Sequence, residues 1–152
     1  MAITRQEAQE QIIDALAVAV EDIALAVACF SEAYEQLPDD SADQLEAELF
    51  RPAQKAYGRA KNTRDGFAAR FDLAAPEPEA AAPGLKSQGA KVFIEKAVAY
   101  TSAADGTIAQ LQDTMLPVES GDPELREGLA VVREGLNGLP SVARDFLRTL
   151  GR

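Results

Sequence analysis

Acidic and basic side chains supply most of the chemistry that this sequence could perform. Its 152 residues include 25 Asp and Glu, 15 Lys and Arg, one cysteine and no histidine. The absence of histidine excludes Ser-His-Asp and Cys-His catalysis, histidine phosphotransfer, histidine-ligated haem and di-iron sites built on Glu-x-x-His. The single Cys29 excludes an internal disulfide and a cysteine-based zinc site. Chemistry in this protein would therefore have to use carboxylates and cations.

One group of carboxylates lies in two predicted connections between helices. Oxygen ligands of this kind suit Ca²⁺ or Mg²⁺. No segment has the Asp-x-Asp-x-Asp-Gly spacing of a preformed calcium loop, and helix capping already explains Asp40 and Asp122. We therefore expect no metal and no other cofactor. The candidate ligands, if a metal did bind, are Asp39, Asp40, Asp43, Glu119 and Asp122.

Two Glu-x-x-Glu pairs, Glu7/Glu10 and Glu32/Glu35, offer a second arrangement of carboxylates. Some all-helical nucleotide pyrophosphatases hold Mg²⁺ on such pairs, with further acids on neighbouring helices. Here the helical phase places both pairs on the solvent side of their helix. A metal-dependent hydrolase of this type is the enzyme alternative, and we expect instead that the protein is not an enzyme.

Basic residues form a run along the second predicted helix. Arg51, Lys55 and Arg59 are four residues apart and share one face, which makes them a candidate site for a small anion or an acidic protein partner. The run continues with Lys61, Arg64 and Arg70. The alternative, which we favour, is pairing with carboxylates of the first helix, each exposed pair contributing about 0–1 kcal/mol.

An apolar strip, Val18, Leu25 and Cys29, lies among the acidic residues of the first helix. Spacings of seven and four keep these side chains on one helical surface. The strip is a candidate interface, most simply of a two-fold homodimer through this helix. The alternative is a helix that is buried on more than one side within the monomer.

Four long helical segments must position these residues. Apolar residues recur at steps of three and four, and prolines or a Pro-rich stretch separate the segments. We predict helices over about 4–37, 41–72, 88–116 and 123–150, and a flexible linker over 73–87. Pro52 and Pro140 fall inside helical patterns, so we predict kinks in the second and fourth helices. Residues 1–152 form a single domain.

The predicted fold is all-α, an antiparallel up-down-up-down four-helix bundle. Short first and third connections make each pair of consecutive helices a hairpin. In this order the first and third helices run parallel, and both short connections lie at one end. That end would gather the candidate metal ligands, and an alanine-rich interior could leave a cavity for a small apolar ligand.

The formal net charge of −10 disfavours nucleic acid and acidic membrane surfaces as partners. The apolar stretch 15–30 carries Glu21 and Asp22 at its centre, which does not suit a membrane span. We expect a cytoplasmic, non-catalytic interaction or scaffold protein that pairs with itself or with another protein.

Overall fold

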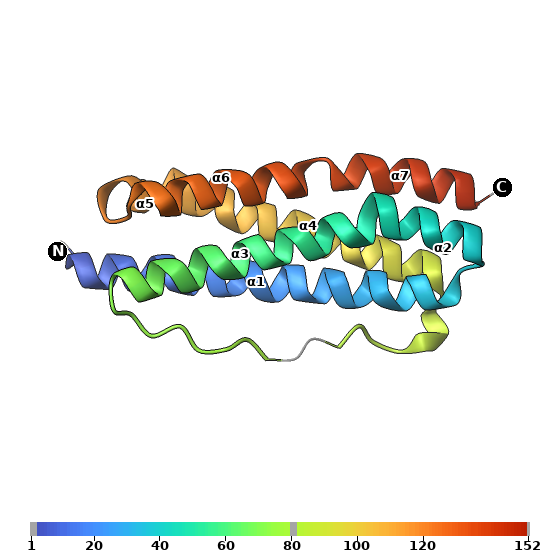
Figure 1. Ribbon diagram of the computed structural model, residues 1–152, viewed down its shortest axis with the longest axis horizontal. Helices are drawn as coiled ribbons and strands as arrows, with labels where there is room; N and C mark the ends of the chain where they lie inside the picture. Colours follow the sequence, from blue (N-terminus) through green and yellow to red (C-terminus); the bar gives the residue numbers. More distant parts are fainter. Residues whose placement is uncertain (1–2, 80–81, 152) are drawn as a thin grey trace.

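The computed structural model describes residues 3–79 and 82–151, and this part of the chain is helical without any strand (Figure 1). The all-α prediction is confirmed. The elements in chain order are α1 (Arg5–Gln36), α2 (Asp39–Leu45), the π-helix η1 (Glu46–Phe50), α3 (Arg51–Arg70), the 3₁₀ turn η2 (Lys86–Gln88), α4 (Ala90–Asp113), α5 (Leu116–Glu119), α6 (Pro123–Asn137) and α7 (Leu139–Leu150).

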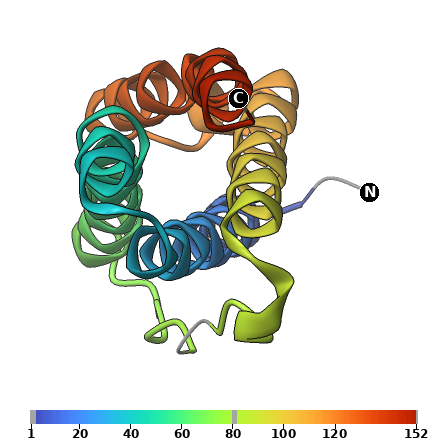
Figure 2. The same cartoon turned by 90° about the vertical axis from the view of Figure 1, so that its right-hand side faces the viewer.

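The helices lie side by side as rods around a common axis (Figure 2). One rod is α1, the second is α2, η1 and α3, the third is α4, and the fourth is α6 followed by α7. Each rod turns its apolar stripe inward, so that Phe30, Phe67 and Phe93 are fully buried. Burial of such side chains contributes about 1.5–3 kcal/mol each, and it drives the packing of the rods.

The direction of α4 differs from the prediction. Gln36 Nε2 at the end of α1 donates to Lys86 O just before α4, over 2.9 Å. Gln9 Nε2 near the start of α1 donates to Ser120 O just after α5, over 3.2 Å. The helices α1 and α4 are therefore antiparallel, and the predicted up-down-up-down order, in which they are parallel, is wrong.

The connection between α3 and α4 explains the reversal. Figure 1 shows this segment running alongside α1 from one end of the molecule to the other, so α4 begins far from the place where α3 ends. At about 3.3 Å per residue, the residues between Arg70 and Ala90 can span more than 50 Å, whereas the 24 residues of α4 rise only about 36 Å. A segment of this length permits a crossover, and a hairpin is not required. We call residues 71–89 the crossover segment.

Alanine seams favour the antiparallel packing of α1 against α4, which is the most extensive helix pair. Ala19, Ala26 and Ala33 on α1 are seven residues apart, as are Ala97 and Ala104 on α4, and all five are fully buried. Small side chains at this spacing allow the two backbones to approach closely along their whole length. The buried alanines thus permit the close packing of α1 against α4 that the structure has.

Both predicted proline sites lie at junctions between elements. Pro52 lacks an N–H and is the second residue of α3, which directly follows the π-helix η1, and the Arg51 N–H donates to Glu46 O five residues back. Pro140 is the second residue of α7, which is separated from α6 by Gly138 alone. Gly138 keeps helical dihedral angles, and the Val142 N–H donates to its carbonyl over 3.2 Å. The predicted helix 123–150 is therefore one rod with a single-residue interruption.

Gly128 sets the distance between α3 and α6, and this yields a stability prediction. A Cβ at Gly128 would lie 2.7 Å from Thr63 Cγ2, whereas a Cβ at Gly58 would meet nothing within 4 Å. We expect Gly128→Ala to lower the free energy of unfolding by about 1–2 kcal/mol, because overpacking exceeds the gain in helix propensity. Gly58→Ala, the matched control, should raise it by up to about 1 kcal/mol. Urea denaturation measures both, and equal effects of the two substitutions would contradict the close approach.

Candidate functional site

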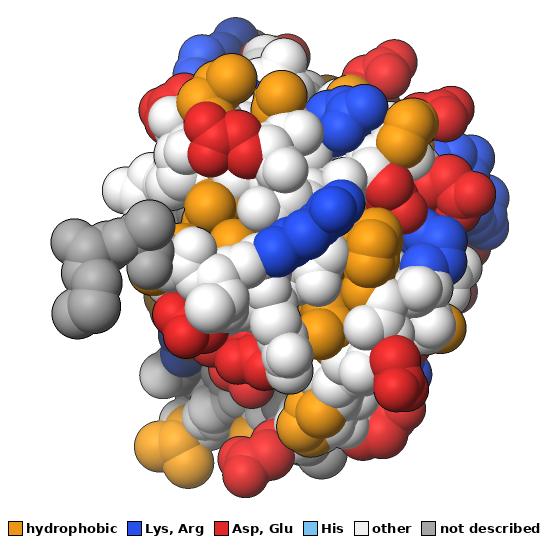
Figure 3. All heavy atoms as spheres, turned by 90° about the vertical axis from the view of Figure 1, so that its left-hand side faces the viewer, with side chains coloured by type: hydrophobic (Ala, Val, Ile, Leu, Met, Phe, Trp, Pro, Cys, Tyr) orange, Lys and Arg blue, Asp and Glu red, His pale blue; other side chains and the backbone are white. Residues whose placement is uncertain are grey.

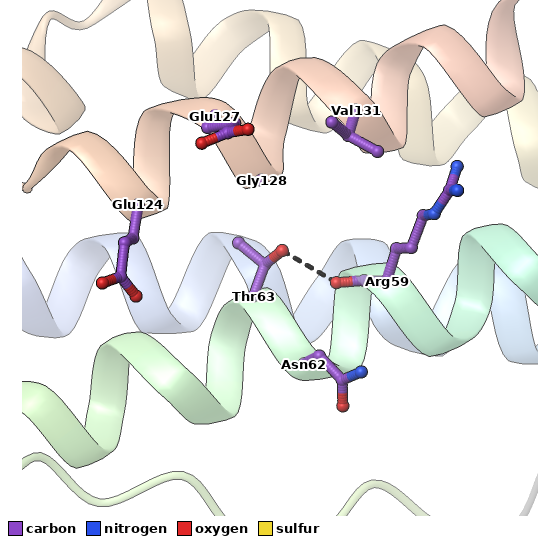
Figure 4. A pocket seen from close by; sticks show the side chains of 7 residues that line it. All are labelled: Arg59, Asn62, Thr63, Glu124, Glu127, Gly128 and Val131. Carbon is purple, nitrogen blue, oxygen red and sulfur yellow. Dashed lines mark hydrogen bonds between the residues drawn. The ribbon is translucent and has the colours of Figure 1, made fainter.

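A groove between α3 and α6 collects several polar side chains on the surface of the molecule (Figure 4). Its volume is about 360 Å³. One wall comes from α3 and the other from α6, which runs antiparallel to it. The lining residues are Arg59, Asn62 and Thr63 on α3 and Glu124, Glu127, Gly128 and Val131 on α6.

The groove has a narrow floor and charged rims. Thr63 Oγ1 donates to Arg59 O over 2.7 Å, so its proton is already used within α3. Figure 4 shows Arg59 toward the end at which Val131 lies, with Glu124 and Glu127 toward the other end. A ligand in this groove would therefore meet a cation at one end and carboxylates at the other.

An ion-pair cluster closes one end of the groove and joins the end of α3 to the start of α6. Arg70 Nε lies 2.6 Å from Asp122 Oδ2, and Arg70 Nη1 lies 3.0 Å from Glu124 Oε2. Asp122 also caps α6 by accepting from the Leu125 N–H over 2.8 Å. The hydrogen bond from Arg70 lowers the pKa of the Asp122 carboxyl, against a smaller opposing effect of its burial. The cap of α6 is therefore held in its charged form.

The sequence had identified one feature of this region, the basic row on α3 that consists of Arg51, Lys55 and Arg59. Arg51 pairs with Glu46 of its own rod over 2.8 Å. Lys55 and Arg59 are exposed and form no ion pair with any residue in 3–79 or 82–151. The expected pairing of this row with carboxylates of α1 is therefore wrong, and Arg59 instead lines the groove beside α6. The charges of Lys55 and Arg59 remain available to a ligand.

The other residues of the basic run, Lys61, Arg64 and Arg70, lie in environments that differ from one another. Lys61 Nζ lies 3.1 Å from Glu77 Oε2 of the crossover segment. Arg64 is buried, with its side chain only 2% exposed, and its Nε donates to Asp65 Oδ1 over 3.0 Å. Helical phase places Arg64 on the core side of α3, together with Ala60 and Phe67. The number of charged residues in the sequence does not predict the burial of Arg64. Its spacing of four residues from Ala60 and three from Phe67 does predict it.

The structure separates the candidate metal ligands. Asp39, Asp40 and Asp43 belong to α2, beside the end of α1, whereas Glu119 and Asp122 lie at the opposite end, beside the start of α1. The predicted meeting of the two connections is wrong, because the crossover segment reverses the second half of the fold. Within the described ranges no three His, Cys, Asp or Glu side chains come close enough to hold an ion.

One of the two Glu-x-x-Glu pairs differs from the prediction, whereas Glu7 and Glu10 are exposed as predicted. Glu32 is buried rather than on the solvent side, and it accepts from Gln36 Nε2 over 3.1 Å. Gln36 in turn donates to Lys86 O of the turn that precedes α4. Glu32 thus helps to hold Gln36 beside the crossover segment, and it is not part of an open pair with Glu35.

The apolar strip on α1 is not one continuous surface. Val18 is 50% exposed, Leu25 is half-buried and Cys29 is fully buried. Burial raises the pKa of the Cys29 thiol, opposed by the positive charge of Lys96 on α4. Cys29 therefore belongs to the core, as the alternative of burial on more than one side predicted, and only Val18 is freely exposed.

Comparison with known proteins gives no relative on which to base a function. No protein-family model, curated protein or solved structure matches this chain. In the described residues, no helix is both long enough and apolar enough to cross a membrane.

The Arg70–Asp122 pair gives a pH-dependent prediction. The pKa of Asp122 is lowered in the folded state, so its charged form adds stability above the ordinary Asp pKa, and this contribution is lost as the pH falls through the lowered value. Asp122→Asn keeps an oxygen for the cap and removes the charge. We expect it to reduce the free energy of unfolding by about 1 kcal/mol at pH 7, a deficit that shrinks below about pH 4.

A matched control is Asp145→Asn, since Asp145 and Arg148 form an exposed pair in α7, 69% and 63% exposed. This substitution should change the free energy of unfolding by less than about 0.5 kcal/mol. Denaturation at several pH values measures both variants. A deficit for Asp122→Asn that stays constant down to pH 2 would show that charge is not its cause.

Proposed function

We propose that this protein is a non-catalytic interaction protein that holds a helical segment of another protein along the α3–α6 groove. The observation that supports it best is the charge arrangement of the groove. Arg59 on one rim is exposed and unpaired within the described residues, as is Lys55 four residues before it on α3, and Glu127 is exposed on the other rim. In a chain with a net charge of −10, free cations on a single helix face favour an acidic partner.

The two rims also define the kind of partner that would fit. A helix with acidic residues along one edge and basic residues along the other would meet opposite charges on both sides. The small residues Gly128 and Thr63 at the floor would let an apolar side chain approach beside Val131. A polyphosphate would meet Glu124 and Glu127 and be repelled, so the groove favours protein over nucleic acid.

Homodimerisation through α1 is a second candidate, supported by the exposed Val18 on the outer face of that helix. Such a dimer would lose Cys29 from its contact surface and would depend on Val18 and Leu25. Light scattering that returns the monomer mass would remove this candidate.

Binding of a small apolar ligand is a third candidate, and its site would be a surface groove. Between α1 and α3 a groove of about 390 Å³ is lined by Phe50 and Tyr57 and by small α1 residues such as Ala24 and Ala28. Its volume is in the range of small-molecule sites. A ligand that co-purifies and is seen by native mass spectrometry supports it, and ligand-free protein from the native host argues against it.

We also propose the finer architecture and location. The architecture would be a four-helix bundle with antiparallel neighbours, one crossover connection, and bends at Pro52 and Pro140, folded as a single domain over 1–152. Hydrogen bonds join both ends of α1 to the second half of the chain, at Ser120 and at Lys86, and they support a single domain. A cytoplasmic location fits the single, buried Cys29, which needs no oxidising compartment.

Site-specific photo-crosslinking in the native host tests the groove. A photoreactive residue at Asn62, inside the groove, should give one discrete adduct with a partner protein, and the adduct should disappear when Lys55→Glu and Arg59→Glu are combined. The same residue at Ser102, exposed on α4, is the matched control and should give no such adduct. Equal adducts at both positions, or an adduct that survives the charge reversal, would contradict the proposal.

A further inference from the structure

The most exposed large apolar side chain in the described part of the chain lies in a short turn at the end of the crossover segment. Leu85, just before η2, is 73% exposed, more than any other large hydrophobic residue there. Seven residues later, Val92 in the first turn of α4 is 39% exposed. Two exposed apolar side chains thus occur within eight residues of the sequence.

Two cations lie next to these side chains in the sequence, while the carboxylate of Glu32 is at the end of α1, where Gln36 links it to Lys86 O. Lys86 and Lys91 are exposed, and neither forms an ion pair with a residue of the described ranges. No Asp or Glu occurs between Glu79 and Glu95. The charged residues between Glu79 and Glu95 are therefore all basic, in a chain whose net charge is −10.

The start of α4 adds to the positive potential. Its N-cap is Gly89, which offers no side-chain acceptor, and its first turn holds no acid. By contrast, α1 begins with Thr4 as cap and Glu7 in its first turn. The N-terminal end of a helix carries a partial positive charge, and no acid in the first turn of α4 and no side-chain cap offsets it.

The turn is held in place by bonds on both sides. Lys96 Nζ donates to Pro83 O over 3.2 Å and to Gln88 Oε1 over 3.1 Å, while Gln36 Nε2 donates to Lys86 O over 2.9 Å. Gly84 and Gly89, at φ +108° and +89°, bend the backbone at either side. A turn fixed in this way loses little conformational entropy when a partner binds.

The opposite end of the molecule does not combine these features. Met115 and Val118 are exposed apolar residues there. Figure 3 shows that apolar atoms on that end face are scattered among charges of both signs. That surface indicates no particular partner charge, so the basic turn is the better defined of the two.

We propose that residues 85–92 form a second docking surface, which binds an acidic segment of a protein partner carrying an apolar side chain. The apolar side chain would lie against Leu85 and Val92, and the acids would pair with Lys86, Lys91 and the start of α4. Charge complementarity selects an acidic occupant. This surface is independent of the α3–α6 groove, since Figure 2 places η2 and α3 on different sides of α1.

Fluorescence anisotropy with a labelled twelve-residue peptide tests the surface. The peptide contains Asp and Glu around one central Phe, and a second peptide has Ser in place of the Phe. We expect saturable, salt-sensitive binding of the Phe peptide, about fivefold weaker with Leu85→Ser and about tenfold weaker with Lys86→Glu and Lys91→Glu combined. Val118→Ser and Arg144→Glu change exposed side chains of the same kinds outside every proposed surface, and they should change the affinity by less than about twofold.

Amide chemical shifts of ¹⁵N-labelled protein then locate the binding, and circular dichroism confirms that each variant is folded. Shifts concentrated in 85–92 support the proposal. Shifts concentrated around 51–63 would overturn it while supporting the α3–α6 groove, and absence of saturable binding would overturn it without affecting the groove's crosslinking test. Leu85-dependent binding to vesicles of anionic lipid, without binding to the peptide, would identify a membrane surface in place of a protein partner and would also overturn it.

Discussion

The crossover from α3 to α4 is the constraint on which the rest of the structure depends. It carries the chain along α1 to the far end of the fold, so α4 returns antiparallel to α1 and their alanine seams pack along their whole length. It also brings the start of α6 to the end of α3, where Arg70 binds Asp122. A hairpin in place of the crossover would break each of these contacts.

The same connection determines which side chains are available for binding. It places Asp39 and Asp122 at opposite ends, and so removes the carboxylate group that a hairpin order would create. Beside α1 it holds Glu77 against Lys61 and Lys86 against Gln36, so it takes up polar groups of α1 and α3 that would otherwise face solvent. The exposed cations outside any ion pair of the described residues include Lys55 and Arg59 on α3 and Lys86 and Lys91 around the start of α4, besides the separate Arg5 and Arg144. An acidic molecule thus keeps two separate basic surfaces.

Much of the fold could be predicted from local patterns in the sequence. Apolar periodicity located every long helix, and Asp122 followed by Pro123 marked the start of α6, where Asp122 is indeed the cap. The topology could not be predicted, because a linker of this length fits either order and loop entropy changes little with length. The burial of Cys29 and Glu32 depended on that topology, since both lie where α4 and the crossover segment meet α1. The basic row was identified, whereas its pairing was not, because Arg51 pairs with Glu46 of η1 and not with a residue of α1, and Lys55 and Arg59 form no ion pair in 3–79 or 82–151.

The most direct test of the crossover is a pair of distances measured by electron paramagnetic resonance on Cys29→Ser protein. Spin labels are placed at the exposed positions Glu35 and Ser87 in one sample and at Glu35 and Glu119 in another. The crossover predicts a short distance for the first pair and, for the second, one near the length of α1, about 48 Å for 32 residues. A long first distance with a short second one would contradict the crossover and restore the hairpin order.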